Sequence, residues 1–383
     1  MSDTKRHIPF TLPYWGSQEK KAVSAALSAT IGTGDGPYSE KMVSQLSKLL
    51  GTSHILPVTS CTHGMECAIR ALGVGPGDEV IVPSFTLSAT ANGIVLAGAK
   101  PVFADIEDET YGIDPKSVES LISRRTRGIM VVHYAGMPCR IDEILDIARK
   151  NKLFVIEDAA HCIGASYNGK ALGTFGDAGS FSFHGTKNVC CGEGGVLVAS
   201  NEALYEAMDE IRVNGTNRRL FLKGMVDRYT WVRAGSSYWL SDLLAAIVTV
   251  QLPKIPQINK KRTAIAQEFT KTFAQFADIL TIPRVPKGSK PNWHIYAVRF
   301  ATKTLADSFY DKMREAGIAV STHYVPLHSS PFGRKLQGNR YRELPVATRV
   351  YETLVRIPIY PGLTKADITY ITTTARGILS RLR

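Results

Sequence analysis

The segment FSFHGTKNVCCGEGG, residues 181–195, places one lysine, Lys187, on a glycine-rich backbone between two strand-like runs. Residues 180–184 alternate apolar and polar side chains, and residues 196–200 (VLVAS) form a second apolar run. Two interpretations of Lys187 are open. It is either a solvated lysine in a surface loop, which is the common case, or a buried amine that loses its proton easily and reacts.

A second group of reactive side chains ends the apolar run 153–158. That run finishes in Glu157 and Asp158, and His161 comes three residues after the aspartate. A carboxylate at the end of a buried strand is costly unless something positive pairs with it. We expect one of the two acids to be a helix cap or an ion-pair partner, while a functional and a structural role for the two together both stay open.

A third polar segment, Thr59 to Thr62, lies between a strand-like run at 55–58 and a helical stretch. Hydroxyl groups and free backbone N–H groups at a helix N-terminus form a site for an anion. Ser and Thr are also the usual helix-capping residues, so a simple cap is the better explanation of this segment taken alone.

All three segments lie at the ends of predicted strands. In a mostly parallel sheet, ligands bind beyond the carboxyl ends of the strands, so the three segments can face one pocket. One cofactor requires all three features: pyridoxal phosphate has a phosphate to anchor, a pyridine nitrogen that a carboxylate keeps protonated, and an aldehyde that condenses with a lysine. The glycines that follow Lys187 would let the backbone pass close to the cofactor and to a neighbouring subunit.

The elements that must position these residues alternate between short β-branched runs and amphipathic helical stretches from residue 54 to about 200. Near-continuous apolar strands separated by helices predict an α/β fold with a mostly parallel, seven-stranded sheet covered on both faces. The predicted strands are 55–58, 79–83, 101–106, 128–134, 153–158, 180–184 and 196–200.

The pattern changes near residues 253–262 (PKIPQINKKR), where two prolines precede a basic helix start. We therefore expect a large cofactor-binding domain over residues 1–250 and a smaller α+β domain over residues 251–383. In the smaller domain the pattern predicts helices at 263–276 and 305–317, strands at 294–300 and 319–325, and a final helix.

The composition excludes several classes of protein. Hydrophobic residues at 44% and charged residues at 21% are typical of a globular chain, and no apolar run is long enough to span a bilayer. The formal net charge is +12, but the basic residues are dispersed and form no recognition helix or aromatic-studded stripe. Nucleic-acid binding is therefore not favoured, and a small substrate that carries phosphates explains the charge at least as well.

The six cysteines contain no CxxC pair and no Cys/His spacing suited to zinc, so we expect no metal. Their sparse use, and an N-terminus without the apolar stretch of a signal peptide, favour reduced thiols in the cytoplasm. Cys190 and Cys191 lie beside Lys187, but adjacent cysteines in a packed loop are more often inert than redox-active.

Blocks along nearly the whole chain resemble one enzyme family. SCTHGMECAIRALGVGPGDEVIVPSFTLSATANGIVLAGAKPVFADI, VVHYAGMP, FVIEDAAHCIGA and GSFSFHGTKNVCCGEGG, then GTNRR, VDRYTW, GSSYWLSDLLAAIVTVQL and HYVPLH, are similar to the DegT/DnrJ/StrS sugar aminotransferases. The resemblance implies the aspartate-aminotransferase fold (fold type I), pyridoxal 5'-phosphate as cofactor, and a homodimer whose active sites are shared across the interface. VDRYTW and GSSYWLSD resemble in particular the branch that makes dTDP-4-amino-4,6-dideoxygalactose.

The resemblance also implies a role for individual residues. Lys187 would bind the cofactor covalently and later move protons, Asp158 would pair with the ring nitrogen, and His161 would lie near the ring hydroxyl. The remaining implied cofactor contacts are the backbone of Cys61 and Thr62, the Ser182 hydroxyl, His184, Leu87, and Ser237 toward the phosphate bound by the partner subunit.

Two positions depart from the family pattern. Leu87 stands where relatives often place an aromatic residue against the pyridine face, so stacking worth about 0.5–1.5 kcal/mol would be replaced by plain apolar contact. Ser237 stands where asparagine is frequent, which weakens the expected phosphate contact. Lys187 itself argues against the family's sugar dehydratases, in which a histidine takes that place.

The resemblance implies that L-glutamate donates an amino group and that a dTDP-4-keto-6-deoxyhexose accepts it, for surface polysaccharides such as lipopolysaccharide O-antigen. Amination at carbon three of the sugar uses the same lysine and stays open. A regulator that holds the cofactor without turnover, or another lysine-dependent pyridoxal enzyme acting on amino acids, are the alternatives. Arg218, Arg219 and Lys223 either meet the substrate diphosphate or form a solvated basic loop, and His323 and Tyr324 are candidates to reach the sugar.

Overall fold

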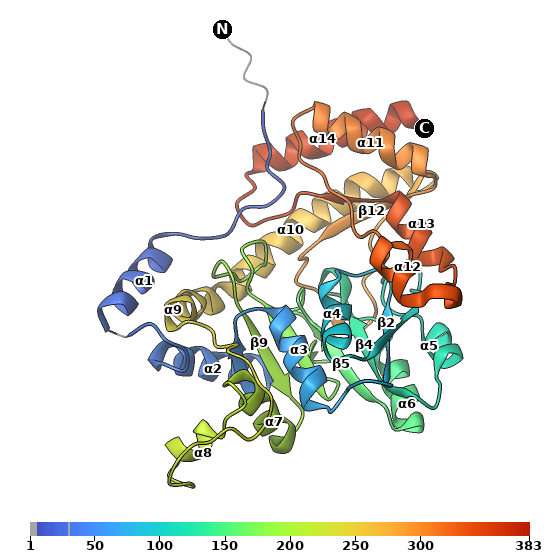
Figure 1. The fold of residues 1–383 in the computed structure, drawn as a ribbon. Coiled ribbons are helices and arrows are strands. Elements are labelled where there is room, and N and C mark those ends of the chain that lie inside the picture. The colour runs from blue at the N-terminus through green and yellow to red at the C-terminus, as the bar shows by residue number, and fades with distance from the viewer. Residues whose placement is uncertain (1–5, 30) are drawn as a thin grey trace.

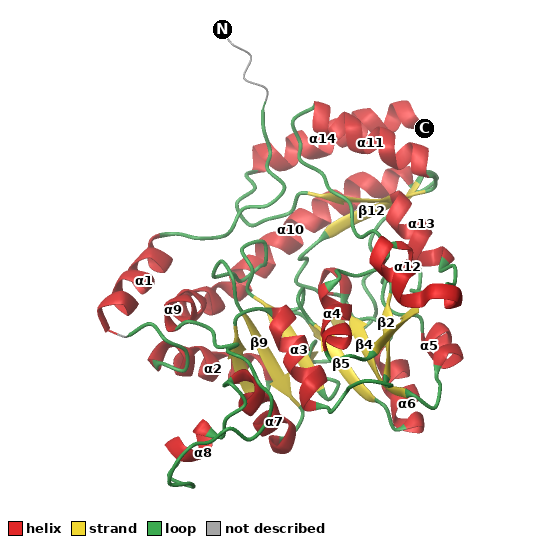
Figure 2. Ribbon diagram, viewed as in Figure 1, coloured by secondary structure: helices red, strands yellow, loops and turns green. Residues whose placement is uncertain are grey.

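A seven-stranded sheet is the largest element of the protein, whose computed structural model describes residues 6–29 and 31–383 (Figures 1 and 2). The strand order is β1-β9-β8-β5-β4-β2-β3. Neighbours from β8 to β3 pair in parallel, and only β9 runs against its neighbours β8 and β1. The predicted mostly parallel, seven-stranded sheet is confirmed. Its strands are β1 Ile55–Val58, β2 Glu79–Pro83, β3 Lys100–Ala104, β4 Thr126–Val132, β5 Phe154–Asp158, β8 Ala178–Ser182 and β9 Gly195–Ala199.

Helices cover both faces of this sheet because successive strand residues point to opposite sides. Val80 and Val82 pack toward α3, α4 and α7, whereas Ile81 between them packs toward α5 and α6. On the same face as α5 and α6, Phe181 and Val196 pack against α2 and α9. These helices are α2 Pro37–Leu50, α3 Cys61–Ala71, α4 Ala89–Leu96, α5 Pro115–Leu121, α6 Ile141–Asn151, α7 Glu202–Arg212 and α9 Asp242–Gln251.

The C-terminal third builds a second core around a three-stranded antiparallel sheet, which lies above the large sheet in Figure 1. The predicted strand at 294–300 and helix at 305–317 match β12 and α11, while α10 starts eight residues before the predicted 263 because PKIPQINKKR is itself helical. The division of the chain at residue 250 stays a prediction. The elements are β10 Leu280–Thr281, β12 Tyr296–Phe300, β13 Leu354–Ile357, α10 Ile255–Phe273, α11 Lys303–Glu315 and α14 Lys365–Leu382.

The predicted strand at 319–325 is wrong. β13 takes the place beside β12, and the backbone of the 319–325 segment pairs with it at one isolated bridge, between Ser321 and Arg356. Pro326, which has no N–H to donate, ends the segment. The segment is instead a loop in which the adjacent His323 and Tyr324 both line a cavity.

Shorter elements complete the chain. α8 lies at the tip of a projecting segment at the lower left of Figure 1, beyond α7. No helix in the described residues is long and apolar enough to cross a membrane. The additional elements are α1 Ser17–Ala29, α8 Arg218–Leu222, α12 Pro331–Gln337, α13 Pro345–Thr353, and a small sheet of β6 Ser166–Tyr167, β7 Lys170–Ala171 and β11 Ser289–Lys290.

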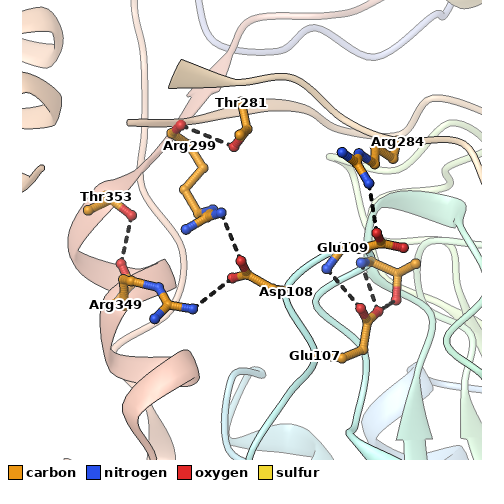
Figure 3. A network of polar contacts seen from close by, with 9 residues as sticks. Glu107, Asp108, Glu109, Thr281, Arg284, Arg299, Arg349 and Thr353 are labelled. Atoms are coloured by element: carbon orange, nitrogen blue, oxygen red, sulfur yellow. Dashed lines mark hydrogen bonds and ion pairs between the residues drawn. The ribbon is translucent and has the colours of Figure 1, made fainter. Parts of the chain in front are cut away.

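The two parts of the molecule are joined by apolar and ionic contacts. Ile295 and Leu354 of the smaller part belong to the same buried cluster as α3 and α4. Figure 3 shows Asp108, in the loop after β3, between the guanidinium groups of Arg299 and Arg349 at 3.0 and 3.1 Å. In the same loop Glu109 accepts from Arg284 at 2.7 Å. The large sheet and the smaller part are thus held in one arrangement, which matters because the cavity described next is lined by both.

Candidate active site

Lys187 lies in a tight turn between β8 and β9. The turn is closed by the Lys187 N–H, which donates to the His184 carbonyl at 2.9 Å, and by the Gly185 N–H, which donates to the Gly192 carbonyl at 2.8 Å. Gly192 has a φ of +98°, a conformation that side-chain-bearing residues rarely adopt. A Cβ at Gly195 would lie 2.6 Å from the backbone nitrogen of Cys61, so glycine there lets β9 pass against the start of α3.

The side chain of Lys187 is half-buried and lines a cavity of about 330 Å³. Burial lowers the pKa of its amine below the ordinary lysine value, and nearby Cys61 and Asp158 oppose that shift only in part. An amine with a lowered pKa is neutral more of the time and is a better nucleophile and base. Of the two interpretations of Lys187, the structure therefore favours the buried amine over the solvated one.

Asp158 ends β5 and faces the same cavity with 6% of its surface exposed. Its carboxylate accepts from the Thr90 hydroxyl at 2.8 Å and from the Ala160 N–H at 3.1 Å. Burial raises its pKa, and these two donors and Lys187 counter the rise. No ion-pair partner lies within 4 Å of this carboxylate among the described residues. A cation brought into the cavity would therefore stabilise it.

The adjacent acid, Glu157, has a structural role, as we expected for one of the two. It is fully buried, 2.8 Å from Nε2 of His133, and accepts from the N–H groups of Gly173 and Gly176 at 2.8 and 2.7 Å. Nδ1 of His133 accepts from the Cys139 N–H at 3.2 Å, so Nε2 carries the proton that is donated to Glu157. Glu157 thereby fixes the loop before β8 and leaves Asp158 as the acid that faces the cavity.

The N-terminus of α3 forms another wall of the cavity through Ser60, Cys61 and Thr62. The Ser60 hydroxyl caps the helix by accepting from the His63 N–H at 3.1 Å, so the capping explanation is correct for Ser60. The first N–H groups of a helix have no acceptor within it, and those of Cys61 and Thr62 are of this kind. Ser182, at the end of β8, lines the same cavity and accepts from the His184 N–H at 3.2 Å. Together these groups are donors suited to a phosphate.

His161 is buried between the cavity and a cluster of aromatic rings. Burial, and then the charge of Lys187, lower its pKa well below the ordinary histidine value, so the imidazole is neutral. The Ala135 N–H donates to Nδ1 at 3.3 Å, which leaves the proton on Nε2. A neutral ring with Nε2–H is a hydrogen-bond donor to an oxygen in the cavity.

Four other predicted residues also line the cavity. His184 lies at its rim, where Nδ1 is 2.9 Å from the Thr186 hydroxyl, and Leu87 is 55% exposed at the entrance. His323 and Tyr324 enter from the smaller part of the molecule with their rings stacked at 4.0 Å. Residues far apart in the sequence thus meet around Lys187.

The remaining predicted residues lie outside this cavity in their own chain. Ser237 is exposed and pairs with Val213. The guanidinium of Arg218 lies over Trp239 at 4.9 Å, and that of Arg219 lies over Tyr205 at 4.3 Å. Lys223 is exposed just after α8. Any contact of these four with substrate or cofactor would have to be made in the site of another subunit.

Sequence reasoning missed three residues of the site. Thr90 donates to Asp158, and nothing in its surroundings distinguished it from any other threonine in a helix. The ring of His294 lies 4.6 Å from that of His161 at an angle of 36°, and His294 lies 3.0 Å from the side chain of Asn188, the residue after Lys187. Arg356 is a lone charge inside the apolar run VRIPIY, and such a charge in a buried strand is the signal that would have found it.

The cavity fits pyridoxal phosphate on three independent observations. The buried carboxylate of Asp158 has no cationic partner, as a site for a protonated pyridine nitrogen requires. The start of α3 and Ser182 offer donors for a phosphate, and Lys187 offers an amine of lowered pKa for the aldehyde. Across the described residues, no group of three or more His, Cys, Asp or Glu side chains is arranged to hold a metal ion.

Comparison with known proteins extends this picture. Residues 13–376 match the model of the DegT/DnrJ/EryC1/StrS aminotransferase family. The chain is 37% identical to the uncharacterised protein MJ1066 of Methanocaldococcus jannaschii, over 91% of this chain and 92% of that one. It is 34% identical to the spore coat polysaccharide biosynthesis protein SpsC of Bacillus subtilis, over 97% of each.

Among solved structures, the PLP form of Spr1654 from Streptococcus pneumoniae superposes with a TM-score of 0.90 at 25% identity, covering 99% of this chain and 100% of that one. Spr1654 has also been solved in its PMP form, with a TM-score of 0.89. The predicted aminotransferase fold is confirmed by these matches.

Proposed function

The chain belongs to the DegT/DnrJ/EryC1/StrS aminotransferase family and is a pyridoxal-phosphate-dependent aminotransferase, and from this premise we propose that it aminates a dTDP-4-keto-6-deoxyhexose. L-Glutamate is the proposed donor and dTDP-4-amino-4,6-dideoxygalactose the proposed product, for a surface polysaccharide such as lipopolysaccharide O-antigen. Two relatives support a sugar substrate: SpsC is named for polysaccharide biosynthesis, and Spr1654 carries a provisional name as a sugar aminotransferase.

The observation that carries the catalytic part of the proposal is the meeting of Lys187, Asp158 and the start of α3 in one cavity. When bound, pyridoxal phosphate supplies an electron sink for the charge that develops on the donor's α-carbon. Nζ of Lys187, whose pKa burial lowers, takes in its neutral form the proton from that carbon and returns a proton during each half of the cycle. In sum, glutamate is oxidised by two electrons to 2-oxoglutarate, and the keto carbon of the sugar is reduced to an amine that carries the transferred nitrogen.

Other residues of the chain hold the reacting groups. The N–H groups of Cys61 and Thr62 and the Ser182 hydroxyl are the proposed anchors for the phosphate, and Asp158 is the proposed partner of the ring nitrogen. His161 donates through Nε2 to the ring oxygen in this proposal. His184, Leu87, His323 and Tyr324 shape the space above Lys187 that the substrates enter.

The test is incubation of the holoenzyme with dTDP-4-keto-6-deoxyglucose and L-glutamate, followed by NMR of the product. We expect an amine at carbon four with the galacto configuration, together with one equivalent of 2-oxoglutarate. An amine at carbon three, as in the alternative dTDP-3-keto-6-deoxyhexose reaction, would refute the acceptor. A cofactor spectrum that glutamate does not change would indicate a regulator that binds the cofactor without turnover.

We further propose that two copies of the chain pair and complete each other's sites. The projecting segment around α8 exposes Met225 and Trp231, with 67% and 75% of their surfaces accessible, which is costly for a monomer. Ser237, Arg218, Arg219 and Lys223 flank or belong to this segment, and in the proposal they reach the partner's cofactor phosphate and the substrate diphosphate.

The proposed location is the cytoplasm. All six cysteines are buried and unpaired, including the adjacent Cys190 and Cys191, as in a reducing compartment.

A further inference from the structure

The segment HYVPLH, residues 323–328, supplies two side chains from the smaller part of the molecule, His323 and Tyr324, to the wall of the active-site cavity. Its backbone is bridged to β13 at Ser321, and at the other end it is held by Ser84, which directly follows β2 of the large sheet. In the part of the chain that the structure describes, the four residues after Ser321 make no backbone–backbone hydrogen bond. The place of the two side chains in the cavity therefore depends on the anchor at Ser84.

Ser84 holds the segment through three hydrogen bonds. Its carbonyl accepts from the Leu327 N–H at 2.9 Å, and its hydroxyl accepts from the His328 N–H at 3.1 Å. The same hydroxyl lies 2.7 Å from Nδ1 of His328, and among the described residues no other acceptor lies within hydrogen-bond distance of it. The serine proton is therefore donated to Nδ1, which leaves the ring proton on Nε2. The side chains of Ser84 and His328 are both fully buried.

His328 makes these bonds at a cost in stability, because its Nε2–H group is buried and has no hydrogen-bond partner within residues 6–29 and 31–383. Burial lowers the pKa of the ring, Glu343 and Asp105 oppose that shift, and Arg334 adds to it. The ring is thus neutral at physiological pH, and it lies against the ring of Tyr341 with the centroids 5.9 Å apart. A leucine would fill the same space without an unpaired donor. What the histidine adds is the acceptor for the Ser84 hydroxyl.

Ser84 is also connected to the acid of the site. Its carbonyl accepts a second hydrogen bond, from the Thr86 N–H at 3.1 Å. The Thr86 hydroxyl lies 2.7 Å from that of Thr90, which donates to Asp158 at 2.8 Å. Since the Thr90 proton is used on the carboxylate, Thr86 donates to Thr90. The residue that anchors the wall from the smaller part thus belongs to the loop that supports Asp158.

We propose that His328 is a positioning residue, which by orienting Ser84 fixes His323 and Tyr324 in the space that the substrates enter. His328 touches neither substrate nor cofactor and acts through the serine. The inference goes beyond the proposed function and does not depend on which keto sugar is aminated. Without the bond between Ser84 and His328 the anchored end of the segment is released, so substrate binding should weaken, whereas proton transfer by Lys187, which belongs to another loop, should persist.

The experiment compares the holoenzyme with three of its variants. Ser84→Ala removes the hydroxyl, His328→Leu removes the acceptor, and His328→Asn keeps an acceptor in the place of Nδ1 without the unpaired Nε2–H group. Hydrogen-exchange mass spectrometry of the peptide that covers residues 321–330 measures the anchor directly and needs no substrate. At one fixed pH, exchange relative to the intrinsic rates should be at least about fivefold faster in Ser84→Ala and His328→Leu, and unchanged in His328→Asn.

The donor half-reaction, followed through the cofactor spectrum, separates binding from chemistry. The KM for L-glutamate should rise about 5- to 30-fold in Ser84→Ala and His328→Leu, as expected for the loss of one buried hydrogen bond. In His328→Asn it should return to within about twofold of the wild type. The maximal rate constant should change by less than about threefold in all three variants, because Lys187 is untouched.

Thr270→Val is the matched control. The Thr270 hydroxyl lies 3.1 Å from the Tyr296 oxygen in the core of the smaller part, so this variant also loses a partly buried hydrogen bond there. It should leave both the KM and the exchange of residues 321–330 unchanged.

Two results would overturn the inference. One is a KM or an exchange rate in folded Ser84→Ala that matches the wild type. The other is an equal defect in His328→Asn and His328→Leu, which would make the shape of the ring the requirement and not its bond to Ser84. Should His328→Leu fail to fold, Ser84→Ala decides by the same two measurements. A wild-type enzyme that does not react with glutamate would refute the proposed donor, and the exchange measurement, which needs no donor, would still decide this inference.

Discussion

The neighbouring acids Glu157 and Asp158, at the end of β5, have different roles because their side chains point to opposite sides of the strand. Glu157 points to a loop and accepts hydrogen bonds from backbone N–H groups and from His133. Asp158 points to the cavity and accepts from the Thr90 hydroxyl, the Ala160 N–H and, at 3.9 Å, the Cys61 thiol. At the scale of single residues, then, one acid stabilises the protein and its neighbour is kept for the cofactor.

This division predicts opposite effects of two amide substitutions. Asp158→Asn should lower turnover by about a hundredfold or more, since it removes the negative charge proposed to pair with the ring nitrogen of the cofactor. Its thermal midpoint should remain near that of the wild type, because the amide can still bond Thr90 and Ala160. Glu157→Gln should instead destabilise the chain by about 1–3 kcal/mol, since its NH2 group faces backbone donors. Turnover assays and urea titrations of both variants check the pair, and the reverse assignment of effects would contradict it.

The lowered pKa of Lys187 predicts a pH dependence of stability in the apoenzyme. Below the folded pKa, Lys187 is an ammonium in both states, but only the native state buries it. At such pH values the lysine therefore lowers the unfolding free energy relative to Lys187→Met. As pH rises from the folded pKa toward the ordinary value near 10.4, the unfolded chain binds more protons than the folded one, and the cost falls. The difference in unfolding free energy between the two proteins should therefore shrink as pH rises. A constant difference from pH 7 to 10 would show that the amine is not desolvated.

At the scale of elements, the site depends on the close passage of β9 against the first turn of α3. Gly195 is the contact point, and its backbone lies where any side chain would meet Cys61 and Phe181. A glycine after Lys187 is thus required by a contact within one chain, in addition to the expected contact with a partner subunit.

Gly195→Ala should destabilise the protein by about 1–3 kcal/mol through overpacking, and it should weaken cofactor binding because the anion-binding turn of α3 must shift. Gly377→Ala is the control, since a Cβ in that part of α14 meets nothing within 4 Å. That control should be neutral or stabilising by about 0.5–1 kcal/mol. Denaturant titration and cofactor titration of both variants test the contact, and equal behaviour of the two would exclude it.

Much of this element-level picture could be predicted from the sequence. The seven strands follow from apolar runs such as EVIVP and LFVIED, and the residues at their carboxyl ends meet because parallel strands end at one edge. The predicted strand at 319–325 failed because a short run of β-formers also suits an extended loop, and here β13 already occupies the place beside β12. Thr90 and Arg356 were missed because their partners, Asp158 and His323, are distant in the sequence and become neighbours only in the folded chain.

At the scale of the whole molecule, the site depends on how the two parts of the chain are placed against each other. Lys187 and Asp158 come from the large sheet, whereas Arg356 and His323 come from the smaller part. Asp108, between Arg299 and Arg349, makes two of the ionic contacts that join the two parts at the surface (Figure 3).

Asp108→Asn should therefore change stability by less than about 1 kcal/mol, as for other exposed ion pairs. Loosening this contact should raise the KM for the donor by up to about fivefold, because residues of both parts line the cavity. Asp146→Asn, which removes an exposed pair with Arg149 within α6, should leave the KM unchanged. Steady-state kinetics at low salt distinguish the two variants, and a shared effect would mean that general surface charge is responsible.

The most direct measurement reduces the holoenzyme with borohydride, digests it and locates the cofactor by mass spectrometry. We expect a single modified peptide, with the phosphopyridoxyl group on the amine of residue 187, and no turnover in Lys187→Arg. Attachment to any other lysine, or full activity in that variant, would contradict it.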